Sequence, residues 1–152
     1  MKTNDDCIFG FDGDNTFLCN FFKTPITFEG ADYPSSEHAF QAAKVLTNEE
    51  RVPFQTAAGL TCGKAKHIGQ HVKLRKDWEQ VKNLIMYKIL TIKFTANDEL
   101  KQKLLATGNK KLVEANTWED LYWGVDKATG KGKNVLGELL MELRLVLQHM
   151  HG

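Results

Sequence analysis

Hydrophobic residues recur at helical spacing in the second half of the chain. Residues 78–94 predict an amphipathic helix, with Lys88 as the only polar side chain on its apolar face. Asn97 can cap a following helix, which Gly108 ends. Residues 134–148 carry a broad apolar stripe and predict a helix that is buried along one side. The apolar face expected in the first of these helices consists of Val81, Leu84, Ile85, Ile89 and Ile92.

The N-terminal part of the chain has a different pattern, rich in aromatic residues and broken by glycines. Residues 26–33 alternate on either side of Glu29 and Gly30, which is typical of a β-hairpin. A sheet this small must pack on helices to be stable. Because no segment repeats another and no linker divides the chain, we expect one domain spanning residues 1–152. The predicted fold class is α+β, mainly α-helical, with a small N-terminal β element.

A helix expected at residues 35–46 carries polar side chains on one face. Ser35 can cap it, and Glu37, Gln41 and Lys44 follow at i, i+4 and i+7. A carboxylate, an amide and an amine aligned over two turns can form a site. The alternative interpretation is a solvated helix face with a Glu–Lys pair. Thr47 can cap a further short helix within residues 47–58.

The overall composition narrows the possible functions. Lys and Arg total 20 against 19 Asp and Glu, so no global charge draws the protein onto nucleic acid or an anionic membrane. The first residues lack the apolar core of a signal peptide, and no apolar run is long enough to cross a bilayer. The three cysteines form no CxxC pair, which favours reduced thiols. We therefore expect a cytoplasmic protein that has no membrane partner.

Two further patterns are weaker indications of ligand binding. His67 and His71 have the i, i+4 spacing of metal ligands, but no third ligand is evident, so a metal site is not expected. The alternating glycines and lysines of residues 130–133 can wrap backbone N–H groups around a phosphate. They lack the spacing of a Walker A loop, and a solvated loop is the usual interpretation of such a segment.

Short motifs that span most of the chain resemble one family when they are taken in order. They are FLCNF at 17–21, FEG at 28–30, YPSSEHAFQAAK at 33–44, RKDWE at 75–79, DLYWG at 120–124 and GKNVLG at 132–137. This ordered set resembles the NADAR, or YbiA-like, family of N-glycosidases over roughly residues 17–147. Cys19 departs from the family pattern, which usually has a serine there, so a hydroxyl is missing beside Asn20.

The resemblance implies an enzyme that hydrolyses the C–N bond between a ribose carbon and a base or amine. The expected substrates are ribosylaminopyrimidine phosphates, intermediates of riboflavin synthesis, with release of ribose 5-phosphate. Two alternatives are removal of ADP-ribose from guanine bases in nucleic acid, and a non-catalytic module that binds ADP-ribose or a nucleotide. The near-neutral charge favours the small-molecule substrate. The chemistry requires no cofactor, and no obligate protein partner is evident.

The matching positions carry side chains that suit this chemistry. Bond cleavage places positive charge on the ribose, so a carboxylate can stabilise that charge or deprotonate the attacking water. We expect Glu37 and Asp120 to be the carboxylate pair, without assigning which of them is the base. Lys44 is the third catalytic candidate: a neutral amine can form a Schiff base with the opened sugar, and the alternative is a structural lysine.

The remaining candidates are expected to bind the substrate. Aromatic rings can stack on a base, amides can hydrogen-bond the ribose or base, and cations can bind phosphate. The candidates are Asn20, Phe21, Arg75, Trp123, Gly124, Lys133 and Asn134.

Overall fold

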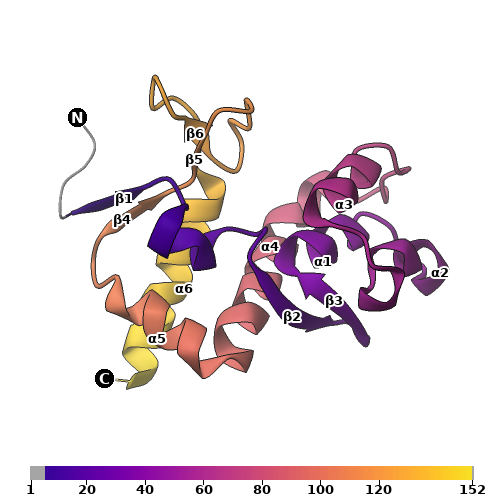
Figure 1. Ribbon diagram of the computed structural model, residues 1–152, viewed down its shortest axis with the longest axis horizontal. Helices are drawn as coiled ribbons and strands as arrows, with labels where there is room; N and C mark the ends of the chain where they lie inside the picture. Colours follow the sequence, from indigo (N-terminus) through magenta and orange to yellow (C-terminus); the bar gives the residue numbers. More distant parts are fainter. Residues whose placement is uncertain (1–5, 152) are drawn as a thin grey trace. The chain divides into compact units, whose positions relative to one another are not determined.

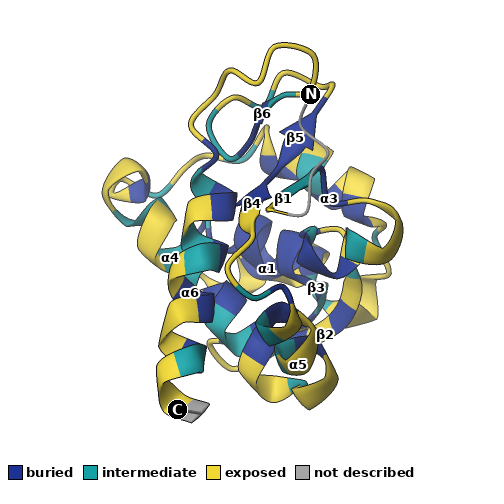
Figure 2. Cartoon of the chain, turned by 90° about the vertical axis from the view of Figure 1, so that its left-hand side faces the viewer, coloured by how far each residue is buried: buried dark blue, intermediate teal, exposed yellow. Residues whose placement is uncertain are grey.

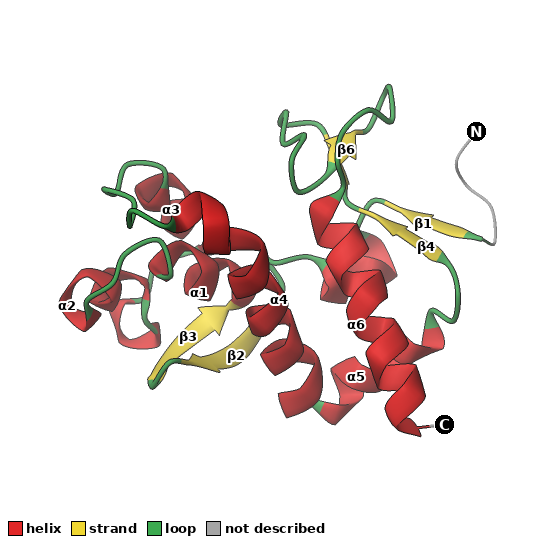
Figure 3. Ribbon diagram, turned by 180° about the vertical axis from the view of Figure 1, so that it is seen from behind, coloured by secondary structure: helices red, strands yellow, loops and turns green. Residues whose placement is uncertain are grey.

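The computed structural model describes residues 6–151, the last of these by its backbone alone. The chain forms two compact units. One unit is continuous and runs from Asn20 to Ala96, whereas the other joins the residues up to Cys19 with those from Asn97 onward. Figure 1 shows the elements of both units in chain order. Helices predominate over a few short strands, which confirms the predicted α+β class (Figure 3).

A β-hairpin begins the continuous unit. Strands β2 (Lys23–Phe28) and β3 (Ala31–Ser35) pair antiparallel, with Ile26 opposite Tyr33. Glu29 and Gly30 form the turn at φ 49° and 85°, as a type I′ turn requires at both central residues. The predicted hairpin is confirmed, and its strands extend beyond residues 26–33.

Helix α1 (Ser36–Ala42) follows the hairpin directly. The Ser35 side chain accepts a hydrogen bond from the His38 N–H, as expected for the predicted cap. Every residue of α1 is buried, because β2, β3, α3 and α4 all pack against it; the helix is dark blue in Figure 2. The interpretation as a solvated helix face is therefore wrong. The helix is also shorter than expected and ends before Lys44.

The rest of this unit is helical. Thr47 forms a complete capping box at the start of α2 (Asn48–Arg51). The expected short helix is otherwise broken into 3₁₀ turns at Val52–Phe54 and Thr56–Ala58. Two helices follow, α3 (Cys62–Gly69) and α4 (Trp78–Ala96).

The buried face of α4 differs from the predicted one. Leu84, which we expected to face the core, is 70% exposed, and Lys88 is also exposed. Residues 84–86 and 89–90 are apolar in consecutive runs, so helical spacing fits more than one face. The buried residues are Trp78, Met86, Ile89, Leu90, Lys93 and Phe94.

The discontinuous unit pairs short parallel strands. Strand β1 (Cys7–Phe9) lies beside β4 (Lys111–Val113), and β5 (Ala115–Asn116) lies beside β6 (Val125–Asp126). The β1–β4 pair is visible in Figure 3. A 3₁₀ helix spans Gly13–Leu18.

Two longer helices complete the discontinuous unit. Helix α5 (Asp98–Ala106) begins at the predicted Asn97 cap, and α6 (Val135–His151) packs on β4. Both helices were expected from the sequence, whereas none of the strands in this unit was. No described helix is long and apolar enough to cross a membrane.

Candidate active site

The start of α1 places the Glu37 carboxylate among buried polar groups. The Glu37 N–H donates to the backbone carbonyl of Asn20 over 3.0 Å. The Ser36 hydroxyl donates to the Asn20 side-chain oxygen over 2.9 Å. Asn20 is therefore bonded to the start of α1 through both its backbone and its side chain. Glu37 is 8% exposed, and Asn20 is also buried. The structure therefore brings these two predicted residues together.

Gln41 joins this cluster from the next turn of α1. Its Nε2 donates to the Glu37 Oε2 over 2.6 Å, the i, i+4 contact that helical spacing allows. Gln41 was recognised on the polar helix face but was not among the expected site residues. Its spacing from Glu37 was the available signal.

Lys44 lies just beyond α1, in a tight turn. The Lys44 N–H donates to the Gln41 carbonyl over 3.2 Å, and its half-buried Nζ donates to the Gly69 carbonyl over 3.2 Å. Burial lowers the pKa of the Lys44 amine, whereas the nearby Glu37 carboxylate acts to raise it and Lys66 acts to lower it. The structure thus places Lys44 within electrostatic reach of Glu37.

Phe21 presents an exposed ring near the start of the same unit. The residue is 42% exposed, and its carbonyl accepts a hydrogen bond from the Cys62 Sγ at 3.4 Å. An exposed aromatic ring is a suitable surface for a flat base.

Arg75 holds the backbone that carries Lys44. The Arg75 N–H donates to the Lys44 carbonyl over 2.9 Å, and its Nη1 donates to the Ala43 carbonyl over 3.3 Å. The guanidinium also binds both carboxylate oxygens of Asp77, over 2.7 and 3.1 Å. These hydrogen bonds raise the pKa of Arg75. Arg75 therefore has a structural role whether or not it also binds phosphate.

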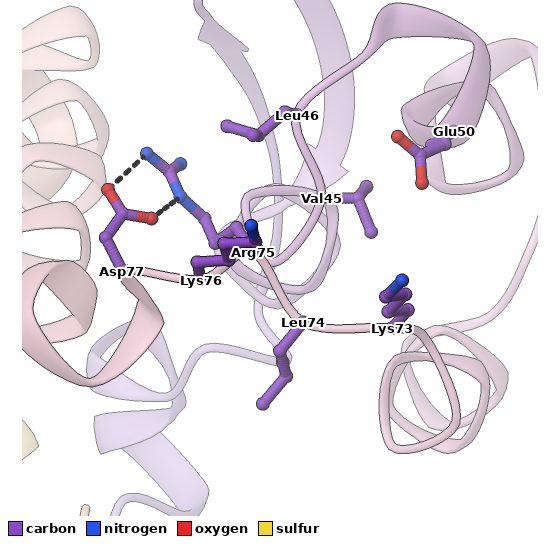
Figure 4. A pocket seen from close by; sticks show the side chains of 8 residues that line it. All are labelled: Val45, Leu46, Glu50, Lys73, Leu74, Arg75, Lys76 and Asp77. Atoms are coloured by element: carbon purple, nitrogen blue, oxygen red, sulfur yellow. Dashed lines mark hydrogen bonds and ion pairs between the residues drawn. The ribbon is translucent and has the colours of Figure 1, made fainter.

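A pocket of about 420 Å³ lies beside Arg75. Figure 4 shows the Arg75 guanidinium directed at Asp77. Glu37 and Lys44 are not among the described residues that line this pocket. The lining residues are Val45, Leu46, Glu50, Lys73, Leu74, Arg75, Lys76 and Asp77.

In the discontinuous unit, Asp120 organises the loop that carries Trp123. Its Oδ1 accepts hydrogen bonds from the backbone N–H groups of Tyr122, at 3.3 Å, and Trp123, at 3.0 Å. The buried Asn116 side chain in turn binds both the N–H and the carbonyl of Asp120. Sequence reasoning missed Asn116, although an asparagine ahead of a polar turn is typical of such side-chain-to-backbone bonding.

Trp123 and Gly124 lie where this loop meets the start of α6. The carbonyls of residues 122–124 accept hydrogen bonds from the first N–H groups at the start of α6. The Trp123 ring is half-buried and lies edge-on to Tyr122 at 4.9 Å between centroids. A Cβ at Gly124 would overlap the Glu114 carbonyl oxygen, so close backbone packing requires glycine there.

Asn134 and Lys133 differ in their exposure. Asn134 is buried at φ 53°; its Oδ1 accepts from the Glu114 N–H and its Nδ2 donates to the Leu112 carbonyl, both over 2.9 Å. Lys133 is exposed, and its Nζ lies 5.4 Å from the centroid of the Tyr122 ring. Lys133 also lines a pocket of about 230 Å³.

The glycine–lysine loop makes most of its backbone hydrogen bonds within the protein. The N–H of Gly130 donates to the Asp126 carbonyl, that of Lys131 to the Thr129 hydroxyl, and that of Lys133 to the Leu121 carbonyl. These three N–H groups already have acceptors. A phosphate at this loop would therefore depend chiefly on the lysine side chains.

The candidate residues are divided between the two units. The structure brings Asn20, Glu37 and Lys44 into one cluster, and Arg75 binds the backbone at Lys44. Asp120 and Trp123 form a second cluster. The carboxylate pair of Glu37 and Asp120 has one member in each unit and stays a prediction. No group of three or more metal-binding side chains occurs among the described residues.

The comparisons with known proteins agree with these motifs. Residues 8–148 match the model of the NADAR domain. The chain belongs to the NADAR family. It is 45% identical over 125 residues to N-glycosidase YbiA of Escherichia coli, which covers 82% of this chain and 77% of that protein. A riboflavin biosynthesis protein of Vibrio vulnificus is 34% identical over 139 residues, covering 90% of this NADAR chain and 37% of the relative.

A solved structure extends the similarity to the fold. The NMR structure of Escherichia coli YbiA has a TM-score of 0.82 and 39% identity, and the match covers 98% of this chain and 89% of that one. The predicted family and fold class are therefore confirmed. The NADAR protein described here is accordingly a hydrolase that acts on N-glycosyl bonds, as the family resemblance implied.

Proposed function

We propose that this NADAR protein hydrolyses the N-glycosyl bond of a ribosylaminopyrimidine phosphate and releases ribose 5-phosphate. The observation that carries the proposal is the buried cluster in which Glu37 acts on the protonation of Lys44. The Vibrio relative, named as a riboflavin biosynthesis protein, supports a riboflavin intermediate as the substrate. A small phosphorylated substrate also agrees with a formal net charge of only +1.

In this mechanism Glu37 is the general base. Its carboxylate takes a proton from water, the water oxygen bonds to the anomeric carbon, and the C–N bonding electrons leave with the nitrogen. Asp120 has a different role, because one of its oxygens already accepts two backbone N–H groups and so fixes the loop of Trp123. The leaving nitrogen takes up one proton, which balances the proton that Glu37 removes from water.

Lys44 provides a second route to the same products. A neutral Lys44 amine attacks the anomeric carbon, the base leaves, and the opened sugar forms a Schiff base that water then hydrolyses. The lowering of the Lys44 pKa by burial increases the fraction of neutral amine at a given pH. The two routes differ in whether the sugar is ever bonded to the protein.

The substrate-binding candidates fill complementary roles in this proposal. Phe21 and Trp123 each offer an aromatic surface for a base, and Asn20 lies next to Glu37. Lys133 is a better phosphate candidate than Arg75, because the Arg75 guanidinium is engaged by Asp77 whereas Lys133 is exposed. We also propose the cytoplasm as the place of action, because all three cysteines are free thiols.

Mass spectrometry of the products tests the proposal directly. The protein is incubated in parallel with a ribosylaminopyrimidine 5′-phosphate and with an ADP-ribosylated guanine oligonucleotide, with Glu37→Gln as the control. Ribose 5-phosphate released from the first substrate alone is the expected result. Release of ADP-ribose from the oligonucleotide alone would replace the proposed substrate with a modified nucleic acid. Binding without cleavage would show a nucleotide-binding module and overturn the proposal.

A further inference from the structure

The Gln41 side chain connects Glu37 with helix α3. Its Nε2 donates to the Glu37 Oε2 over 2.6 Å, while its Oε1 is buried without a hydrogen-bond partner among the described residues. Gln41 is 5% exposed, so water does not reach this carbonyl oxygen freely. An unpaired buried acceptor is destabilising. The position is thus unfavourable for the carbonyl oxygen of Gln41, whereas its Nε2 makes a short hydrogen bond to Glu37.

Gly69 fixes the other side of the Gln41 amide. It is the last residue of α3, which packs against α1 (Figure 1). A Cβ at this glycine would overlap the Gln41 Oε1 and come within 2.6 Å of its Cδ. The Gly69 carbonyl also accepts the Lys44 Nζ. One glycine therefore contacts both the amide that holds Glu37 and the amine of Lys44.

We propose that Gln41 is a positioning residue that orients the Glu37 carboxylate for its work as general base, and that Gly69 keeps Gln41 in place. The inference rests on the proposed function for what Glu37 does. A neutral amide suits this role, because it donates to one chosen oxygen without adding a charge beside the carboxylate. The Gln41 donor at Oε2 restrains the plane of the Glu37 carboxylate and so leaves the other oxygen in a defined direction.

Gln41→Met removes the donor while it keeps an unbranched side chain of similar length. We expect kcat to fall about 10- to 100-fold, the effect of losing a hydrogen bond to a charged group. KM stays within about threefold, because Gln41 acts through Glu37 and not on the bound substrate. Circular dichroism checks the fold of this variant, because the buried Glu37 carboxylate loses a donor while the unpaired carbonyl oxygen is also removed.

Gln41→Glu tests the role of the donor through the pH dependence of activity. The new carboxyl donates to Glu37 only while the two carboxyls share a proton, and they repel each other once both are ionised. Activity should therefore persist at acidic pH and fall as pH rises, at pH values where the native protein is still active. Activity that stays at the native level at pH values where both carboxyls are ionised would contradict the need for a donor at residue 41.

Two glycines of α3 provide a matched pair of variants. Gly69→Ala places a methyl group against the Gln41 amide and should lower kcat about as much as Gln41→Met. Gly63→Ala adds the same methyl group to the same helix, but nothing lies within 4 Å of the new Cβ. It should leave kcat unchanged. Equal kcat in both alanine variants would argue against the role of Gly69.

The decisive measurement combines kinetics with NMR. If Gln41 acts through Glu37, Gln41→Met added to Glu37→Gln lowers kcat no further than Glu37→Gln alone. The titration of the Glu37 carboxyl ¹³C signal, assigned by its loss in Glu37→Gln, should move in Gln41→Met. An unmoved titration with native kcat overturns the inference. A moved titration with a fully active Glu37→Gln variant instead overturns Glu37 as base, and so the proposed mechanism.

Discussion

Lys44 experiences opposing influences on its protonation. Burial lowers its pKa below the ordinary value of 10.5 and outweighs the Glu37 carboxylate, which acts to raise it. The amine therefore loses its proton at a lower pH than a free lysine does. At the scale of single residues, this balance decides whether the lysine is a nucleophile or a scaffold.

Borohydride treatment during turnover distinguishes these roles. A Schiff base between Lys44 and the opened sugar should be reduced to a stable adduct, seen as a mass increase that Lys44→Met abolishes. Only the neutral amine attacks, so the rate of adduct formation should rise with pH. Because the pKa of Lys44 is lowered, the rate should level off below pH 10.5. Active enzyme that shows no mass increase would assign the attack to water.

Glu37→Gln tests the proposed base without changing the size of the side chain. We expect turnover to fall by about two to four orders of magnitude, the usual contribution of general acid–base catalysis. Steady-state kinetics on variant protein of confirmed fold measures this loss. Near-native turnover would remove Glu37 from the role of base.

His38 makes the continuous unit sensitive to acid. Its Nε2 lies 2.7 Å from the Leu60 carbonyl and its Nδ1 lies 2.7 Å from the Ser35 hydroxyl. A carbonyl only accepts, so Nε2 carries the proton and a neutral ring accepts the hydroxyl at Nδ1. Burial lowers the pKa of His38, opposed by the Leu60 hydrogen bond, while Lys23 lowers it further. The folded protein therefore favours the neutral ring.

Stability should consequently fall when this ring is forced to take a proton. The contribution of His38 is fully present above its ordinary pKa of 6.5 and is lost as pH falls through the lower pKa of the folded state. Thermal midpoints between pH 4 and 8, compared with those of His38→Gln, isolate this contribution. Parallel curves for the two proteins would contradict it.

At the scale of elements, local signals predicted where α1 begins but not where it ends. Ser35, the N-cap, directly precedes α1 in the sequence, so the start of the helix is encoded locally. Just beyond its end, the carbonyls of Ala43 and Lys44 accept hydrogen bonds from Arg75, which lies far along the chain. Spacing within residues 35–46 contains no information about that partner.

The other errors have similar physical causes. Strands as short as β5 and β6 show no measurable alternation, so the sequence pattern did not reveal them. In α4, apolar residues on several sides left the buried face ambiguous. For the candidate site, family motifs located the residues and helical spacing related Glu37 to Gln41. The contact with Gly69 required the folded backbone.

The cap of α1 should contribute measurably to stability. Ser35→Ala removes the acceptor for the His38 N–H and the hydroxyl that faces the His38 ring. We expect a loss of about 1–2 kcal/mol in the free energy of unfolding, measured by urea denaturation. Thr47→Ala, at the exposed cap of α2, serves as a comparison and should cost less because its site is open to water. Equal losses would show that burial of the α1 cap adds nothing.

At the scale of the whole molecule, charge sets the expected response to nucleic acid. With 20 basic and 19 acidic residues, the chain has little net attraction for a phosphate backbone. Fluorescence anisotropy with unmodified duplex DNA at physiological salt should give a Kd weaker than roughly 100 µM. Micromolar binding with a steep salt dependence would reveal a basic surface and favour the nucleic-acid substrate.

The order in which the chain leaves the ribosome matters for a protein with one continuous and one discontinuous unit. Residues from Asn20 to Ala96 emerge together, so this unit can complete its contacts early in synthesis. Strand β1 must wait, because its partner β4 is more than a hundred residues further along. Pairing across that distance carries a large loop-closure entropy and is slow. The strand Cys7–Phe9 is therefore synthesised long before β4 and can take its place only after β4 has emerged.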